Sequence, residues 1–186
     1  MTKTGERMLR LMDRAVTEWH LPVIGREKGR ALRRLLATHR PRRALEIGSL
    51  FGYSAILIAG NLGPGGRLTC VEENPYLARF VEANAAAAGF APRVKVVVGD
   101  ALRVLPLLRG PVDFLLIDAR KEDYLDYLRA VEPRLRPGAV VVADNTGVYR
   151  RAVKPYLAHV RRPPYQSREH DFGVDAMEVS ILRAAG

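Results

Sequence analysis

Two short runs of apolar, mostly branched residues constrain the fold of this chain most, because no polar residue interrupts either run. Residues 115–117 (Leu-Leu-Ile) end at Asp118, and residues 140–143 (Val-Val-Val-Ala) end at Asp144 and Asn145. Such runs are typical of strands that are buried on both faces of a parallel sheet. If the two strands are neighbours, the three polar side chains meet at the carboxyl edge of the sheet, where open α/β sheets bind ligands.

Three oxygen donors at one sheet edge suit a divalent cation. Asp118, Asp144 and Asn145 would offer two carboxylates and one amide oxygen. Mg²⁺ prefers such hard ligands and leaves positions for water or substrate. Each acid taken alone is also explained as the N-cap of the helix that follows it. The presence of both acids, with Asn145 adjacent, favours a magnesium site over two caps.

Strands and helices alternate along the chain. The expected strands are residues 43–47, 67–71, 94–98, 113–117 and 139–143, and the expected helices are residues 52–61, 75–88, 101–108, 121–134 and 152–160. Asn74 and Pro75 suit the N-cap and first turn of the second helix. Two later strands, near 165–169 and 177–182, would form a hairpin. The pattern predicts an α/β fold in one domain over residues 1–186, with a doubly wound, mostly parallel seven-stranded sheet and a C-terminal antiparallel hairpin.

Length and composition exclude several classes of protein. The chain has 186 residues, of which 48% are hydrophobic, enough for a full core. Its apolar runs are too short to cross a bilayer, so no membrane association is expected. Residues 1–20 carry charges throughout, which excludes the apolar centre of a signal peptide and predicts an amphipathic helix. Cys70 is the only cysteine, so no intrachain disulfide can form. We expect a cytoplasmic protein.

The formal net charge is +10, and basic residues are concentrated in residues 26–43 and 150–168. A basic surface attracts polyanions. However, aromatic residues are not interleaved with these positive charges, and no nucleic-acid-binding motif accompanies them. A small-molecule substrate is therefore favoured over a nucleic acid. The sequence leaves the oligomeric state open, a homodimer included.

A glycine-bearing loop, residues 47–53, joins the first strand to its helix. Gly48 and Gly52 permit tight turning and close approach by a ligand. Their spacing is Gly-x-x-x-Gly, which lacks the denser glycine pattern that a bound pyrophosphate needs. The loop therefore argues against a nicotinamide dinucleotide.

Acids at the ends of the next two strands complete a nucleoside site. Glu72 ends the second strand, where an acid is suited to bind ribose hydroxyls. Asp100 follows Gly99 at the end of the third strand and could meet an adenine amino group, cap the next helix, or do both. A nucleoside site without a phosphate loop indicates S-adenosylmethionine.

The motifs resemble those of the catechol O-methyltransferase family, which has a class I, Rossmann-like methyltransferase fold and depends on S-adenosylmethionine and Mg²⁺. The resemblance runs from about Glu18 to Ala184. It rests on the loop motif at residues 45–55, Val-Glu-Glu-Asn-Pro at 71–75, the set Asp118, Lys121 and Tyr124, and Ala-Asp-Asn at 143–145. Residues 25–29 and 157–161 also look like segments of this family.

The resemblance implies a role for each matching residue. Asp118, Asp144 and Asn145 would hold Mg²⁺, and Lys121 would be the general base on the reacting hydroxyl. The substrate would contact Lys121, Asn145 and Glu169, the last matching the acid that holds the second catechol hydroxyl. The residues implied in cofactor binding are Ile24, Glu46, Gly48, Ser54, Glu72, Gly99, Asp100, Ala101 and Asp118.

The chain also departs from the family where the acceptor would lie. Arg120 stands where the mammalian enzymes have a tryptophan, and residues 146–154 are basic through Arg150, Arg151 and Lys154. Such a wall would suit an acidic catechol better than a catecholamine. Two alternatives remain open. One is an O-methyltransferase acting on a hydroxylated nucleotide of tRNA, and the other is a nucleoside-binding protein without catalysis.

Overall fold

Seven strands and seven α-helices account for most of the chain in the structure, a computed structural model that describes residues 1–184. The strands are β1 (Arg43–Ile47), β2 (Arg67–Glu72), β3 (Val94–Val98), β4 (Val112–Ile117), β5 (Leu135–Ala143), β6 (Tyr165–Asp171) and β7 (Ala176–Leu182). The helices are α1 (Lys3–Trp19), α2 (Gly25–His39), α3 (Tyr53–Asn61), α4 (Pro75–Ala87), α5 (Ala101–Val104), α6 (Tyr124–Val131) and α7 (Lys154–Val160).

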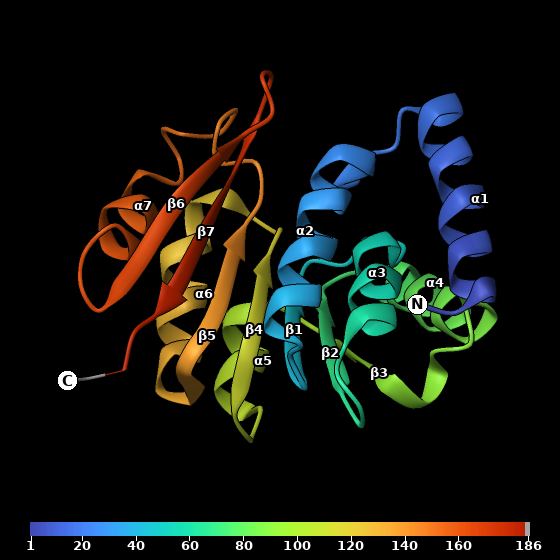
Figure 1. The fold of residues 1–186 in the computed structure, drawn as a ribbon, viewed down its shortest axis with the longest axis horizontal. Coiled ribbons are helices and arrows are strands. Elements are labelled where there is room, and N and C mark those ends of the chain that lie inside the picture. The colour runs from blue at the N-terminus through green and yellow to red at the C-terminus, as the bar shows by residue number, and fades with distance from the viewer. Residues whose placement is uncertain (185–186) are drawn as a thin grey trace.

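One sheet runs through the described residues in the order β3-β2-β1-β4-β5-β7-β6. Strands β1 to β5 pair in parallel, whereas β7 runs antiparallel to both β5 and β6. Figure 1 shows the arrowheads of β4 and β5 side by side at the upper edge, so their carboxyl ends meet there. The arrangement confirms the predicted α/β class, the mostly parallel seven-stranded sheet and the reversed C-terminal strand.

The sheet is buried on both faces, which explains why its central strands lack polar residues. In β4, Phe114 and Leu116 pack in a core with residues of α1 to α4, whereas Leu115 and Ile117 pack in a second core with residues of α6 and α7. All four side chains are fully buried. Successive side chains of a strand point to opposite faces, so a strand covered by helices on both sides needs apolar residues at every position.

The observed elements depart from the predicted bounds near Lys121. The helix expected over residues 121–134 begins as a 3₁₀ turn at Lys121–Asp123, continues as α6 and ends in a second 3₁₀ turn at Glu132–Arg134. Pro133 lies in this last turn, and proline disfavours a continuing α-helix because it lacks an N–H and crowds the preceding turn. No helix within residues 1–184 combines the length and apolar character that crossing a membrane requires.

The cap predicted at the start of α4 is present, whereas neither Asp118 nor Asp144 is the N-cap of a helix. The Asn74 side chain accepts hydrogen bonds from the backbone N–H groups of Tyr76 and Leu77, with Pro75 in the first turn of α4. Residues 3–19 form the predicted N-terminal amphipathic helix, α1, which buries Leu9 and Met12. Strand β5 begins earlier than predicted, so Pro137 and Gly138 lie within it, where its pairing with β4 shifts in register.

Candidate active site

A cavity of about 380 Å³ opens at the carboxyl ends of the central strands. Strands β1 and β4 are neighbours there, and the chain leaves them toward opposite ends of the sheet, which makes this edge a topological switch point. The predicted residues that line the cavity are Ile24, Gly48, Ser54, Glu72, Gly99, Ala101, Asp118 and Lys121. Glu46 and Asp100, also predicted to bind the cofactor, lie outside this lining.

The loop between β1 and α3 is held closed by Glu72 at the end of β2. Glu72 Oε2 accepts the backbone N–H groups of Ser49 at 3.0 Å and Leu50 at 2.9 Å, and Oε1 accepts that of Asn74 at 3.0 Å. Hydrogen bonds to an ionised carboxylate are stronger than neutral ones. Glu72 therefore organises the floor of the cavity, in addition to any contact with a ligand.

Gly48 makes the close approach of β1 and β4 possible. Its φ of +81° lies in the region that side chains disfavour, and an added Cβ would lie 2.3 Å from the backbone oxygen of Asp118. Only glycine fits between the ends of these two strands. The geometry of the cavity thus depends on a glycine that the sequence analysis placed in the cofactor loop.

Glu46 is a fully buried acid beneath the loop. Its Oε2 accepts hydrogen bonds from Ser49 Oγ at 2.8 Å and Cys70 Sγ at 3.2 Å, whereas its buried Oε1 has no partner. Burial raises the pKa of Glu46 to about 7, although the nearby Ser54 hydroxyl and the hydrogen bonds from Ser49 and Cys70 oppose the shift. Buried polar atoms rarely lack a partner. The unpaired oxygen suits a hydrogen-bond donor or positive group supplied by a ligand.

Asp100 caps the helix that follows β3. Its Oδ1 accepts the backbone N–H of Arg103 at 3.3 Å, which confirms the N-cap interpretation. Gly99, at φ +146°, donates its N–H to Glu72 O at 3.0 Å. Gly99 and Ala101 rather than the Asp100 side chain therefore form this part of the cavity wall.

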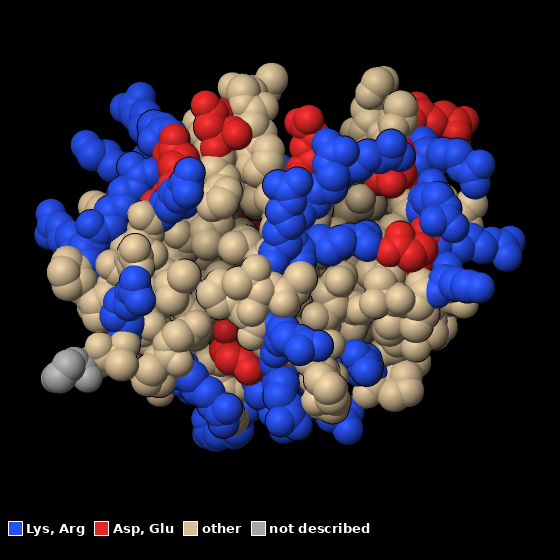
Figure 2. All heavy atoms as spheres, in the orientation of Figure 1, with Lys and Arg blue, Asp and Glu red and all other residues tan. Residues whose placement is uncertain are grey.

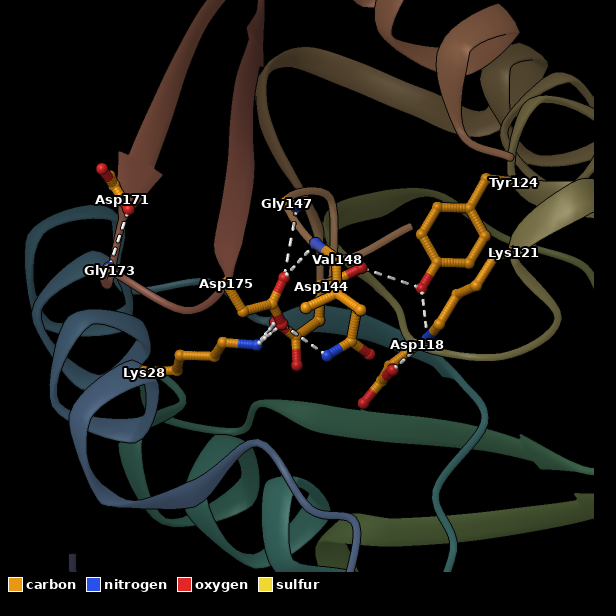
Figure 3. Close-up of polar contacts among 11 residues, drawn as sticks. Lys28, Asp118, Lys121, Tyr124, Asp144, Gly147, Val148, Asp171, Gly173 and Asp175 are labelled. Carbon is orange, nitrogen blue, oxygen red and sulfur yellow. Dashed lines mark hydrogen bonds and ion pairs between the residues drawn. The ribbon is translucent and has the colours of Figure 1, made fainter. Parts of the chain in front are cut away.

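The ends of β4 and β5 share one polar network (Figure 3). Lys121 Nζ donates to Asp118 Oδ1 at 2.7 Å and to Tyr124 Oη at 2.8 Å. The Tyr124 hydroxyl in turn donates to the backbone oxygen of Asp144 at 3.0 Å. The structure thus brings Lys121 together with the ends of both strands, as the sequence predicted for neighbouring strands.

Asp144 is a nearly buried acid that is only partly neutralised. Burial and the negative charge of Asp118 raise the pKa of Asp144 to about 6, although Lys28 opposes the shift. Lys28 Nζ lies 2.5 Å from Asp144 Oδ1 and 2.5 Å from Asp175 Oδ2. Two acids close together in a poorly solvated place favour the binding of a cation.

The donor set determines how well a divalent cation fits. Within residues 1–184, no cluster of three or more His, Cys, Asp or Glu side chains has an arrangement suited to a metal ion. The candidate set contains two carboxylates, so the third protein ligand has to be the amide oxygen of Asn145. Amide oxygens are accepted ligands of hard cations, and the chemistry of the set therefore fits Mg²⁺.

Three polar residues of the network received no role from the sequence: Lys28, Tyr124 and Asp175. Lys28 and Tyr124 lie in segments that resemble the family, which was the available signal. Asp175 directly precedes β7 and accepts Asn145 Nδ2 at 2.7 Å as well as Lys28. Burial alone would raise the pKa of Asp175. The hydrogen bonds that Asp175 accepts, of which that from Lys28 has the largest effect, outweigh burial and lower the pKa.

Glu169 lies apart from this network. It is on β6, where its Oε2 accepts Arg150 Nη2 and Arg161 Nη2, both at 2.7 Å. These hydrogen bonds lower the pKa of Glu169. Among residues 1–184, no hydrogen bond or ion pair joins Glu169 to Asp118, Asp144 or Asn145.

Comparison with known sequences identifies the family. Residues 45–146 match a family model described as a methyltransferase domain. The chain is 36% identical over 168 residues to a catechol O-methyltransferase of Mycobacterium tuberculosis, an alignment covering 88% of this chain and 76% of that protein. It is 35% identical over 145 residues to the catechol O-methyltransferase of Sus scrofa, covering 74% and 77%. The chain belongs to the catechol O-methyltransferase family.

Solved structures of other O-methyltransferases have the same fold as this chain. An O-methyltransferase from Bacillus cereus in complex with SAH superposes with a TM-score of 0.83 at 26% identity, covering 98% of this chain and 92% of that one. The O-methyltransferase TomG from Streptomyces achromogenes, in complex with SAM, gives 0.84 at 28% identity, covering 99% and 91%. The protein is an O-methyltransferase of the type that uses S-adenosylmethionine.

Proposed function

We propose that this methyltransferase transfers the methyl group of S-adenosylmethionine to a hydroxyl of a catechol-type substrate held on Mg²⁺, with Lys121 as the general base. One observation carries the proposal. Lys121 lines the same cavity as the cofactor loop and is hydrogen-bonded to Asp118, which ends β4 beside the loop. A proton acceptor, a candidate cation ligand and the cofactor-binding floor thus meet in one place.

The cation site would be formed by Asp118, Asp144 and Asn145. Mg²⁺ bound there would supply positive charge that favours the ionised form of an acceptor hydroxyl. The raised pKa of Asp144, about 6, reflects an acid in a poorly solvated place beside a second acid. Lys28 contacts Asp144 through Oδ1, which leaves Oδ2 for another partner.

Lys121 would take the proton of the acceptor hydroxyl. Two of its N–H groups point to Asp118 Oδ1 and Tyr124 Oη, and the side chain lines the cavity. When Lys121 is neutral, its nitrogen lone pair can accept the hydroxyl proton while these two contacts hold the amine in position. General-base catalysis contributes about 10²–10⁴ in rate, and alignment of oxygen, methyl carbon and sulfur would contribute further.

The cofactor would occupy the cavity above Glu46 and Glu72. The unpaired Oε1 of Glu46 suits the positively charged methionine part of S-adenosylmethionine. Gly48 keeps the loop close to β4, and Glu72 holds the Ser49 and Leu50 backbone in place. These contacts support the cofactor roles that the family resemblance implies.

The surroundings of the cavity favour an acidic acceptor. Arg120 lines the cavity and is about half exposed. Lys121 Nζ lies over the Tyr149 ring, 5.7 Å from the ring centroid. The residues that follow Tyr149 line a surface hollow of about 650 Å³. The hollow is lined by Arg150, Arg151, Lys154, Leu157, Ala158, Arg161 and Arg162. Figure 2 shows basic side chains gathered at the upper left, over α7 and its preceding loop.

A labelled-methyl assay tests this function. The panel contains a catechol acid, a catecholamine, a flavonoid diol and bulk tRNA, each with Mg²⁺ and with excess EDTA. We expect methylation of the catechol acid that EDTA abolishes and Mg²⁺ restores. Undiminished turnover in EDTA would eliminate the metal role. Methylation of tRNA alone would support the nucleotide alternative, and cofactor binding without transfer to any acceptor would support the non-catalytic one.

A further inference from the structure

We propose that Asp175 is a positioning residue that sets the Mg²⁺ affinity of the Asp118, Asp144 and Asn145 site. The inference rests on the proposed function, because it concerns the cation site of that function. Asp175 is not one of the predicted metal ligands, and it directly precedes β7. It would act through Asn145 and Lys28 rather than by contacting the metal.

The two oxygens of Asp175 have different partners (Figure 3). Oδ1 accepts the backbone N–H groups of Gly147 at 3.2 Å and Val148 at 3.0 Å, which ties β7 to the loop after β5. Oδ2 accepts Lys28 Nζ at 2.5 Å and Asn145 Nδ2 at 2.7 Å. One oxygen therefore holds the backbone, and the other holds the two side chains nearest to the cation site.

The contact with Asn145 fixes which end of its amide faces the cation site. An asparagine side chain has one oxygen acceptor and one nitrogen donor at opposite ends of the amide. Because Nδ2 is hydrogen-bonded to Asp175, Oδ1 is directed away from Asp175 and remains available as a ligand. Without this contact the amide could rotate and present its NH₂ group, which cannot bind a cation.

The positive charge of Lys28 would compete with Mg²⁺ for Asp144, and the contact with Asp175 gives Lys28 a second acidic partner. The Lys28 ammonium is 11% exposed and lies at equal distances from Asp144 Oδ1 and Asp175 Oδ2. If Asp175 lost its charge, Lys28 would pair with Asp144 alone and would oppose the binding of a second cation there. Both effects, and the loss of one negative charge, act in the same direction: they lower the affinity for Mg²⁺.

The substitution Asp175→Asn separates the two oxygens' roles. The asparagine oxygen can still accept the N–H groups of Gly147 and Val148, so the loop keeps its anchor. Its NH₂ group would then face Lys28 and Asn145 Nδ2, which are both donors, and both contacts are lost. We expect the Kd for Mg²⁺, measured calorimetrically with the metal alone, to rise at least about 10-fold. The thermal unfolding midpoint without Mg²⁺ is measured in parallel.

The matched control is Asp171→Asn in the same hairpin. The Asp171 side chain contacts the Gly173 N–H at 2.8 Å and lies apart from the network in Figure 3. Its substitution should leave the Kd for Mg²⁺ unchanged. An unchanged Kd in Asp175→Asn, or an equal loss in both variants, would overturn the inference while leaving the proposed function intact. Absence of Mg²⁺ binding by the unsubstituted protein would instead overturn both.

A double variant, Lys28→Met with Asp175→Asn, tests the contribution of Lys28. It removes the ammonium that would otherwise pair with Asp144, so its Mg²⁺ affinity should exceed that of Asp175→Asn alone. It also removes the buried Lys28 charge, which loses one of its two acidic partners in Asp175→Asn, and this keeps the test usable if the single variant does not fold. A double variant that binds Mg²⁺ as tightly as the unsubstituted protein would overturn the role assigned to Asn145. One that binds no tighter than Asp175→Asn would overturn the competition by Lys28.

Discussion

The Lys121 ammonium lies 2.7 Å from Asp118 Oδ1, so the proposed base and a proposed cation ligand form one ion pair. Lys121 comes three residues after Asp118 and begins the 3₁₀ turn Lys121–Asp123 that precedes α6. A uniform α-helix over residues 121–134, as the sequence predicted, was not required for the contact.

Replacing Lys121 tests its role as the base. In Lys121→Ala we expect kcat to fall by about 10²–10⁴ because no other group takes the acceptor proton. The Kd for S-adenosylmethionine should change little, since the loop, Glu46 and Glu72 remain. Steady-state kinetics and calorimetry measure the two quantities. Lys95→Ala, at an exposed position on β3, is the matched control and should retain full kcat; a normal kcat in Lys121→Ala would remove Lys121 from the mechanism.

Gly48→Ala should destabilise the protein and weaken cofactor binding. The added Cβ would meet the Asp118 backbone oxygen at 2.3 Å, and alanine disfavours the φ of +81°. The loss in the free energy of unfolding should be about 2–5 kcal/mol, measured with urea. Gly89→Ala is an apt control, because Gly89 has the same φ of +81° and nothing lies within 4 Å of its added Cβ. Equal losses in the two variants would show that the close approach to β4 is unimportant.

Local patterns were sufficient to predict the sheet. Uninterrupted apolar runs such as residues 140–143 identified strands buried on both faces, and Asn74 with Pro75 identified the start of α4. These features depend on near neighbours in the sequence. The order of the strands, with β1 and β4 as neighbours, was not predicted, because it depends on pairing between segments that are far apart in the sequence.

The contacts of Lys28 and Asp175 could not be predicted in this way. These residues are 147 positions apart and meet because α2 and the β6–β7 hairpin both reach the carboxyl edge of the sheet. Neither residue lies at a special position in a local pattern. Glu169 illustrates a different case: the family resemblance implied a contact with the substrate, but its hydrogen bonds to Arg150 and Arg161 follow from how the loop after β5, α7 and β6 fold together.

The basic hollow predicts a preference for acidic acceptors. Within residues 1–184, Arg151 and Lys154 form no ion pair, unlike Arg150 and Arg161, which contact Glu169. The double variant Arg151→Ala with Lys154→Ala should raise KM for 3,4-dihydroxybenzoate about 3- to 10-fold. KM for uncharged catechol and kcat for both substrates should stay the same, as initial rates would show. An equal rise in KM for both acceptors would mean that the hollow does not recognise the acid group.

Glu46 should make the stability of the ligand-free protein depend on pH. Burial raises its pKa to about 7 from 4.5, so between these values the folded state binds more protons than the unfolded state. The stabilisation that comes from protonated Glu46 is complete below its unfolded-state pKa of 4.5. It is lost as the pH rises through its folded-state pKa of about 7. The free energy of unfolding of the natural protein, relative to that of Glu46→Gln, should therefore fall by about 3 kcal/mol from acid to neutral pH. Urea unfolding across this range measures the difference; a difference that stays constant with pH would show that Glu46 is ionised in the folded state throughout.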